Sequence, residues 1–195
     1  MFTGIIETIG KITRIENELT NIHIWITCSF VNELKIDQSV AHDGVCLTVV
    51  EIKNNEYRVT AIQETLDKTN LKTWKVGSFV NIERCMPANG RFDGHIVQGH
   101  VDETAKCFQV LDQQGSWKYS FHLNSLKSNL IVEKGSICIN GTSLTVAEVN
   151  ENHFSVFIIP YTFEHTSFKY IKPDSIVNIE YDIIGKYVAK MLQNN

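Results

Sequence analysis

An internal repeat runs through nearly the whole chain. Residues 37–52 (DQSVAHDGVCLTVVEI) recur 97 residues later (37 to 134) as residues 134–149 (KGSICINGTSLTVAEV), and both copies carry S, G, LTV and E in the same order. The same shift superposes VNIE at 80–83 on VNIE at 177–180. Near the N-terminus the register slips by two residues, so that Gly4 lies over Gly99. A period of half the chain indicates duplication of a whole domain, because solenoid repeats have shorter periods of roughly 20–50 residues.

The duplication divides 195 residues into two units of about 95 residues, each long enough for its own core. The formal net charge of -4 and the lack of a basic block argue against nucleic acid as a partner. The five cysteines are an odd number with no CxxC pair, and no secretory segment precedes them, so we expect reduced thiols and a cytoplasmic location. No apolar run reaches the roughly 20 residues of a membrane span, so we expect no membrane partner.

Short β-prone segments separated by turn residues dominate both halves. In the first half we expect strands at 1–12, 21–28, 45–52, 57–62 and 78–85. Residues 63–74 have sparse apolar residues and suit either a short helix or a wide loop. In the second half the expected strands include 117–123, a hairpin over 137–149, and 175–181. The pattern predicts an all-β fold with a small Greek-key barrel in each half.

Two segments fall outside the repeated pattern. Residues 86–94 (MPANGRFDG) hold Pro, Asn-Gly and Asp-Gly, which indicates a linker. From Ile183 onward apolar residues recur at helical spacing, which predicts a helix that either packs on another chain or forms a lid over its own barrel. We therefore divide the chain into an N-terminal barrel (1–88), a linker (89–95), a C-terminal barrel (96–183) and a C-terminal oligomerisation helix (184–195).

Four motifs in order resemble those of the riboflavin synthase family: MFTGIIE at 1–7, GVCLTV at 44–49, GHIVQGHVD at 94–102 and KGSxxINGxSLTV at 134–146. The resemblance covers nearly the whole chain. It implies an all-β fold of two tandem six-stranded Greek-key β-barrels, plus a C-terminal α-helix that builds a homotrimer. It also implies an active site between the N-terminal barrel of one subunit and the C-terminal barrel of another.

The resemblance implies a transferase reaction that uses no cofactor and no metal. Two molecules of 6,7-dimethyl-8-ribityllumazine undergo a dismutation, in which transfer of a four-carbon unit gives riboflavin and 5-amino-6-(ribitylamino)uracil. This is the last step of riboflavin biosynthesis. Two identical substrates need two similar pockets held face to face, which accounts for the duplication. An association with lumazine synthase is left open.

Donor and acceptor substrates play different roles, so positions where the repeat breaks its own symmetry are candidate catalytic residues. The polar members of four such pairs are Lys134 (over Asp37), Ser143 (over Cys46), His100 (over Ile5) and Asp182 (over Cys85). By the resemblance, Ser143 donates a hydrogen bond to the acceptor lumazine, and His100 moves a proton when the C7 methyl group is deprotonated. Asp182 is a partner of Ser143 and His100, Lys134 reaches across the subunit interface, and Cys46 belongs to the donor-side pocket.

Several of these residues also have a structural interpretation. Cys46 and Thr48 alternate along a strand, as do Ser143 and Thr145, so each pair shares a face that either lines a pocket or is satisfied within a core hairpin. Lys134 fits a solvated lysine beside Glu133.

The histidines and Asp182 have structural alternatives as well. Asp182 fits the N-cap of the terminal helix. The spacing of His95 and His100 places them on opposite faces of a strand, which argues against zinc. His95, His122 and His153 match no pocket residue of the family and are expected to be structural or exposed.

The resemblance also assigns residues that contact the substrate. Segments 60–65 and 159–164 are expected to bind the pteridine ring through backbone N–H and C=O groups, which match the donors and acceptors of its uracil-like edge. The expected substrate-binding residues are Gly4, Ile5, Ile6, Cys46, Leu47, Thr48, Thr60, Ala61, Ile62, Gln63, Glu64, Thr65, Gly99, His100, Val101, Lys134, Ser143, Leu144, Thr145, Ile159, Pro160, Tyr161, Thr162, Phe163 and Glu164. Two positions depart from the family pattern: Asp43 stands where Asn is common, and Glu103 where Gly is common.

Two other functions compete with the enzyme. A non-catalytic lumazine- or flavin-binding protein would keep the duplicated barrels and lose parts of the catalytic set, whereas Lys134, Ser143, His100 and Asp182 are all present. A generic β-barrel interaction module leaves the asymmetric polar pairs unexplained. The sequence therefore favours the enzyme.

Overall fold

The computed structural model describes residues 1–123 and 130–193. The strands of the first half are β1 (Thr8–Glu18), β2 (Asn21–Thr27), β3 (Ser39–His42), β4 (Val45–Lys53), β5 (Glu56–Ala61) and β6 (Phe79–Arg84). Those of the second half are β7 (Glu103–Asp112), β8 (Trp117–Leu123), β9 (Ser136–Ile139), β10 (Thr142–Asn150), β11 (His153–Ile158) and β12 (Ile176–Tyr181). The helices are η1 (Val31–Glu33), α1 (Gln63–Lys68), η2 (Asn70–Thr73), α2 (Pro160–His165), η4 (Ser167–Tyr170) and α3 (Ile183–Leu192).

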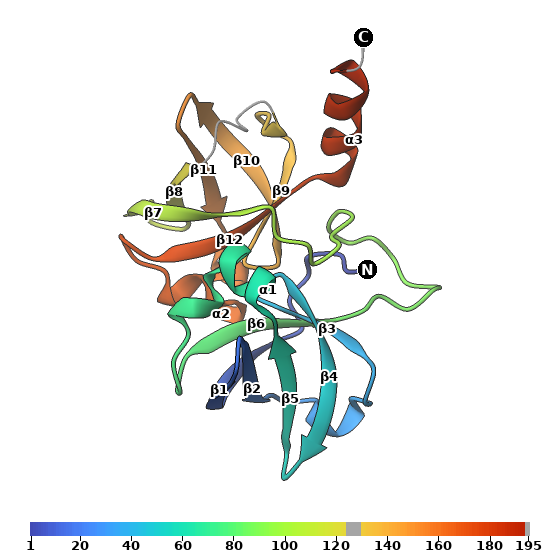
Figure 1. The fold of residues 1–195 in the computed structure, drawn as a ribbon. Coiled ribbons are helices and arrows are strands. Elements are labelled where there is room, and N and C mark those ends of the chain that lie inside the picture. Colours follow the sequence, from blue (N-terminus) through green and yellow to red (C-terminus); the bar gives the residue numbers. More distant parts are fainter. Residues whose placement is uncertain (124–129, 194–195) are drawn as a thin grey trace.

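Each half closes into a six-stranded antiparallel barrel (Figure 1). The order around the first barrel is β1-β2-β5-β4-β3-β6, and the second has the equivalent cyclic order β7-β8-β11-β10-β9-β12. Register shifts recur at equivalent places, between Val49 and Glu51 in β4 and between Val146 and Glu148 in β10. The predicted pair of six-stranded barrels with a C-terminal helix is therefore confirmed, and the repeat extends to irregularities of the sheet.

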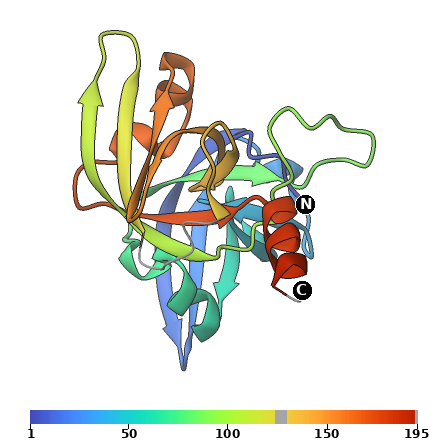
Figure 2. The ribbon, with the colours of Figure 1, turned by 90° about the horizontal axis from the view of Figure 1, so that it is seen from above.

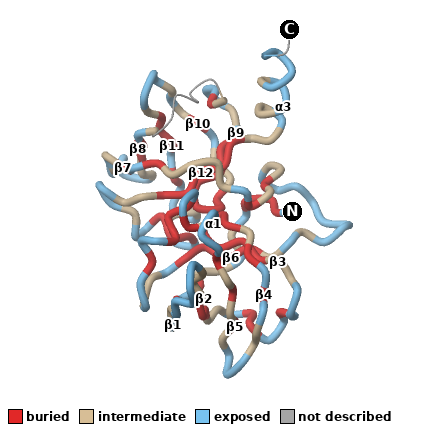
Figure 3. Tube along the Cα trace, in the orientation of Figure 1, coloured by how far each residue is buried: buried red, intermediate tan, exposed pale blue. Residues whose placement is uncertain are grey.

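Alternation along the strands gives each barrel its own core. In β5, Tyr57, Val59 and Ala61 are buried while their neighbours are half exposed. In β11, Phe154, Val156 and Ile158 are buried as well, although Ser155 between them is also buried. Burying an Ile or Phe side chain stabilises a fold by about 1.5–3 kcal/mol. Figure 3 shows that buried segments also gather between the barrels, around β6 and β12.

Seen from above, strands of the two halves lie over one another (Figure 2), and the asparagines of the two VNIE motifs join the barrels. The Asn81 side chain donates to Asn140 O (2.8 Å) and accepts from Ser167 N (2.6 Å). The Asn178 side chain donates to Asp43 O (2.9 Å) and accepts from Asn70 N (2.7 Å). Each asparagine therefore satisfies two backbone groups of the opposite half, and the contacts repeat about an internal pseudo-twofold axis.

The N-terminal segment differs from the predicted strand over 1–12. The strand begins only at Thr8, and Phe2 makes an isolated antiparallel bridge with Val97. Gly4 has a φ of +78°, which a continuous strand cannot accommodate. We name residues 2–5 the N-terminal strap and residues 97–100 the central strap. The central strap lies in the segment that connects β6 to β7. The same segment contains the predicted linker.

The C-terminal helix α3 projects from the second barrel (Figure 1). None of its residues is buried, and its apolar side chains Ile184, Tyr187, Val188, Met191 and Leu192 are exposed. It therefore does not act as a lid that buries apolar residues on its own barrel. Residues 194–195 of the expected helical segment lie outside the described residues. Within the described part of the chain, every helix is too short or too polar to cross a membrane.

Candidate active site

The two straps exchange between the halves. Phe2 and Val97 pair through N–H···O bonds of 2.7 and 3.1 Å. Beyond this bridge, the N-terminal strap contacts the β9–β10 hairpin of the second barrel, and the central strap contacts the β3–β4 hairpin of the first barrel. Ser143 N donates to Gly4 O at 2.8 Å, and Cys46 N donates to Gly99 O at 2.9 Å. Gly4 and Gly99 both have φ of +78°, and a Cβ on either would lie 2.6 Å from the Cβ of Ser143 or Cys46. Only glycine allows this approach, so the two glycines of the repeat are explained by the strap crossing.

The Ser143 site lies at the start of β10 in the second barrel. Ser143 Oγ and His95 Nδ1 share a hydrogen bond of 2.7 Å. Burial lowers the pKa of His95, although the negative charge of Asp182 acts in the opposite direction. A neutral imidazole held against a hydroxyl can accept a proton at neutral pH. Asp182 also accepts from Ile184 N at 2.9 Å, so the predicted N-cap of α3 is present.

The Cys46 site is the counterpart in the first barrel. A cavity of about 220 Å³ is lined by Val45, Cys46, Glu64, Thr65, Lys68, Thr69, Gly99, His100 and Val101. Burial raises the pKa of the Cys46 thiol. A protonated thiol is a poor nucleophile, so the geometry favours a pocket-lining role for Cys46 over covalent attack.

Within one chain, His95 and His100 lie in different sites. His100 lines the Cys46 site, and His95 is the histidine that bonds to Ser143. The crossing of the central strap is the physical reason, because it leaves His95 at the second barrel and carries His100 to the first. His95, which the sequence led us to expect as structural or exposed, is half-buried and hydrogen-bonded to Ser143. With the 95-residue shift that pairs Gly4 with Gly99, His95 has no partner in the first half, so the comparison of the two halves did not single it out.

The remaining histidines and Lys134 lie away from these hydrogen bonds. His122 stacks on Phe108 with ring centroids 4.1 Å apart, and His153 meets the same ring edge-on. Lys134 is exposed, and its backbone N donates to Val146 O (2.9 Å). Its φ of 65° matches that of its repeat partner Asp37 (70°), but the left-handed conformation suits Asp better than Lys.

Side chains next to Cys46 and Ser143 follow the expected alternation. Thr48 and Thr145 are exposed, whereas Leu47 is buried in the core and Leu144 is half-buried. Thr48 and Thr145 are thus open to solvent within a single chain, which disfavours a satisfied core hairpin.

The two segments expected to contact the pteridine ring each end a strand and begin a short helix. Ile62 precedes α1 and Ile159 precedes α2, and both side chains are more than half exposed, at 52% and 58%. Tyr161 is exposed as well, whereas Ala61 is fully buried and has only its backbone to offer. Ile5, at the end of the N-terminal strap, is also exposed. These open edges are consistent with sites that a single chain leaves incomplete.

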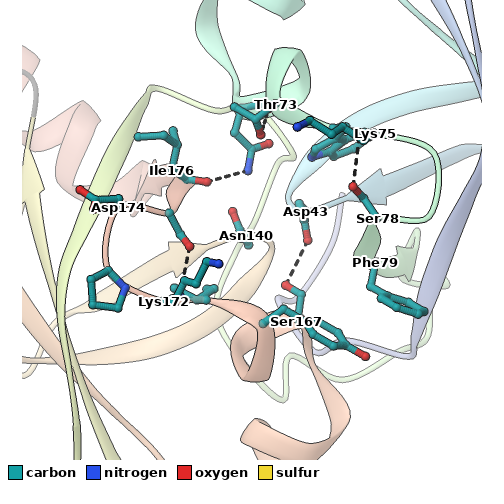
Figure 4. Close-up of a pocket in the computed structure, with 16 residues that line it drawn as sticks. Asp43, Thr73, Lys75, Ser78, Phe79, Asn140, Ser167, Lys172, Asp174 and Ile176 are labelled. Carbon is teal, nitrogen blue, oxygen red and sulfur yellow. Dashed lines mark hydrogen bonds between the residues drawn. The ribbon is translucent and has the colours of Figure 1, made fainter.

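A larger cavity of about 690 Å³ lies between the barrels near the pseudo-twofold axis (Figure 4). Its lining includes Asp43, Asn140, Ser167, Phe79 and Tyr170, and none of the nominated catalytic residues belongs to it. Asp43 Oδ1 accepts from Asn81 N (2.8 Å) and Ser167 Oγ (3.3 Å). Among the described residues, this cavity included, no group of three or more His, Cys, Asp or Glu side chains could hold a metal ion.

Comparison with known proteins finds the same duplication. The family described as "Lumazine binding domain" matches residues 3–85 and again residues 98–182. The chain is 41% identical over 193 residues to riboflavin synthase of Actinobacillus pleuropneumoniae, covering 98% of this chain and 90% of that protein. It is 38% identical to riboflavin synthase of Bacillus subtilis (strain 168) with the same coverage. Riboflavin synthase of Saccharomyces cerevisiae (strain ATCC 204508 / S288c) is 35% identical over 207 residues, covering 98% of this chain and 86% of that protein.

Solved structures of LumP share the fold. A crystal structure of LumP complexed with 6,7-dimethyl-8-(1'-D-ribityl) lumazine superposes with a TM-score of 0.85 at 20% identity, covering 93% of this chain and 99% of that one. LumP complexed with riboflavin gives a TM-score of 0.85 at 23% identity with the same coverage. At this identity the likeness concerns the fold alone.

Proposed function

Because the chain belongs to the riboflavin synthase family, we infer that it is a transferase that converts two molecules of 6,7-dimethyl-8-ribityllumazine into riboflavin and 5-amino-6-(ribitylamino)uracil. The observation that carries this conclusion is the pair of lumazine-binding domains, aligned over 98% of the chain with relatives that are named for this activity. Eight relatives named riboflavin synthase are 32–41% identical to this chain, whereas two LumP structures are 20% and 23% identical, which favours the enzyme over a non-catalytic binding protein.

We propose that the Ser143 and His95 pair handles the proton in this reaction. Removal of a proton from the C7 methyl group of one lumazine leaves a carbanion, and the proton needs an acceptor of suitable basicity. His95 is kept neutral by burial and is oriented by its 2.7 Å hydrogen bond to Ser143. Asp182 acts on His95 electrostatically and stabilises the imidazolium that forms.

Two copies of the chain complete the reaction site in this proposal. The Cys46 site, with His100, binds one lumazine, and the Ser143 site of another copy binds the second. The exposed edges at Ile62, Ile159 and Tyr161 support this arrangement, because a flat ligand stacked between two such edges would be shielded from water on both faces. His100 of one copy then reaches Ser143 of another, although the two are apart within a chain.

Lys134 is proposed to cross the same interface. Its side chain is exposed at the start of the β9–β10 hairpin, on a left-handed backbone (φ 65°) that it shares with its repeat partner Asp37 (70°). The exposed ammonium group of Lys134 is therefore available to a second copy of the chain that packs on the β9–β10 hairpin.

We propose that α3 builds a homotrimer. Four of its apolar side chains, Ile184, Tyr187, Met191 and Leu192, are 61–70% exposed, and an isolated ten-residue helix is marginal in water. A groove of about 590 Å³ between α3 and Leu130 and Val132 offers further apolar surface.

The free thiols of all five cysteines support the proposal of a cytoplasmic location.

The decisive experiment incubates the purified protein with 6,7-dimethyl-8-ribityllumazine and follows riboflavin absorbance. Two substrate molecules should be consumed for each riboflavin formed, without added metal or cofactor. Tight lumazine binding with no riboflavin formed would instead indicate a binding protein.

A further inference from the structure

The last residue of each VNIE motif is a buried carboxylate that holds a strap. Glu83 in β6 is 4% exposed and Glu180 in β12 is 2% exposed. Glu83 accepts from Thr3 N (2.7 Å), Thr3 Oγ1 (3.0 Å) and Gly4 N (3.1 and 3.2 Å). Glu180 accepts from Gln98 N (2.7 Å), Gly99 N (2.9 Å) and His100 N (2.9 Å). The two carboxylates are thus related by the repeat and do the same work.

The same straps also form part of the opposite half's site. Gly4, held by Glu83 of the first barrel, accepts from the backbone of Ser143 in the second. Gly99, held by Glu180 of the second barrel, accepts from the backbone of Cys46 in the first. One glycine therefore links each carboxylate to the site in the other barrel: Gly4 links Glu83 to Ser143, and Gly99 links Glu180 to Cys46.

These contacts require that both oxygens of each carboxylate accept hydrogen bonds. Every strap group that contacts the carboxylates is an N–H or O–H donor, and hydrogen bonds to an ionised acceptor are roughly twice as strong as neutral ones. A glutamine in place of Glu180 would turn an NH₂ group toward at least one N–H donor. Burial raises the pKa of both carboxyls, and the strap N–H groups oppose that rise. The fold thus accepts a desolvation cost at two equivalent positions, each of which fixes a strap.

We propose that Glu83 and Glu180 are positioning residues for the reaction, each holding the strap of its own half in the site of the other half. The Ser143 site then depends on Glu83 of the first barrel, and the Cys46 site depends on Glu180 of the second. This inference rests on the proposed function and adds two residues that touch neither substrate.

The test compares Glu83→Gln and Glu180→Gln with a matched pair of controls, Glu51→Gln and Glu148→Gln. The control residues are also related by the repeat (51 to 148), and they form surface ion pairs with Arg58 and Lys118. We expect kcat for riboflavin formation to fall by about 10²-fold in the two strap variants, because displacement of reacting groups by 1 Å costs about that much. KM should stay close to that of the controls, and the melting temperature should fall below theirs because each strap variant loses buried charge-assisted hydrogen bonds.

A second measurement reports the crossing itself. In full-length protein, Glu180→Gln should speed hydrogen exchange at the Cys46 amide in the first barrel, and Glu83→Gln should speed exchange at the Ser143 amide in the second. If a glutamine variant does not fold, the Asp variant, which keeps the charge and shortens the reach, replaces it with the same expected outcomes.

Turnover within twofold of the controls, or faster exchange confined to the substituted barrel, would overturn this inference. Faster exchange across both barrels would also overturn it, because that pattern indicates general loosening. If the unmodified protein forms no riboflavin, the proposed function fails instead, which is a distinct result.

Discussion

Replacing Asp43 with Asn should stabilise the protein in a pH-dependent way. Asp43 lies at the junction of the barrels, where its repeat partner is Asn140. Asp43 Oδ1 accepts from Asn81 N at 2.8 Å, and Asn140 Oδ1 accepts from Asn178 N at the same distance. An amide therefore already performs this role in the second half, and Asp43→Asn keeps the acceptor oxygen while it removes an ionisable group.

The magnitude follows from the ionisation of Asp43. Burial raises the pKa of Asp43 from 3.8 to about 7, and the bonds from Asn81 and Ser167 only partly oppose this. The folded protein therefore binds this proton more tightly than the unfolded chain, so its stabilising contribution is complete below pH 3.8 and is lost as the pH rises through about 7. A displacement of about three pH units corresponds to an upper limit of about 4 kcal/mol, or a melting temperature change of about 10 °C for a chain of this size.

Thermal unfolding between pH 4 and pH 8 tests this expectation. The Asp43→Asn variant should melt well above the unmodified protein at pH 8, and the difference should shrink toward zero near pH 4. Asp37→Asn, a change at an exposed carboxyl before the same hairpin, is the control and should show no such trend. A difference that does not depend on pH, or a less stable variant at pH 8, would refute the argument.

Three further outcomes are expected. Ser143→Ala and His95→Ala should each lower riboflavin turnover by about 10²- to 10⁴-fold with a smaller effect on lumazine binding, and turnover within twofold of the unmodified protein would contradict their proposed role in proton transfer. Removal of residues from Ile184 onward should convert the proposed trimer to monomers in sedimentation experiments, because the lost helix carries the exposed apolar stripe. Residues 1–88 alone should fold, since they contain all of β1–β6, and should bind lumazine more weakly than the whole protein, since they lack Gly99, His100 and Val101 of the Cys46 site; measurable riboflavin formation by this fragment would contradict the assignment of Ser143 to the catalytic set.

The sequence predicted the barrels because the relevant information is local and repeated. Alternation located the hairpin of β4 and β5, and the shift of 97 residues carried each assignment to the second half. VNIE was visible as a repeat, but its chemistry was not. The structure shows that its Val and Ile lie in the core, its Asn joins the barrels and its Glu holds a strap.

The strap crossing could not be predicted, because alternation within a strand says nothing about which barrel a flanking segment meets. This limit explains why the sequence did not place His95 beside Ser143, and His100 beside Cys46, within one chain. The exposure of α3 was also undecided, since an amphipathic pattern fits a lid and an interface equally well. Both questions depend on contacts between segments far apart in the chain.

The crossing of the straps also sets an order of assembly during translation. Gly4, which contacts the Ser143 backbone, leaves the ribosome long before β10 and must wait until β10 has been synthesised. The central strap waits in turn for Glu180, in the last strand of the second barrel. A nascent chain that stops between the barrels thus carries half of each pocket and a complete version of neither.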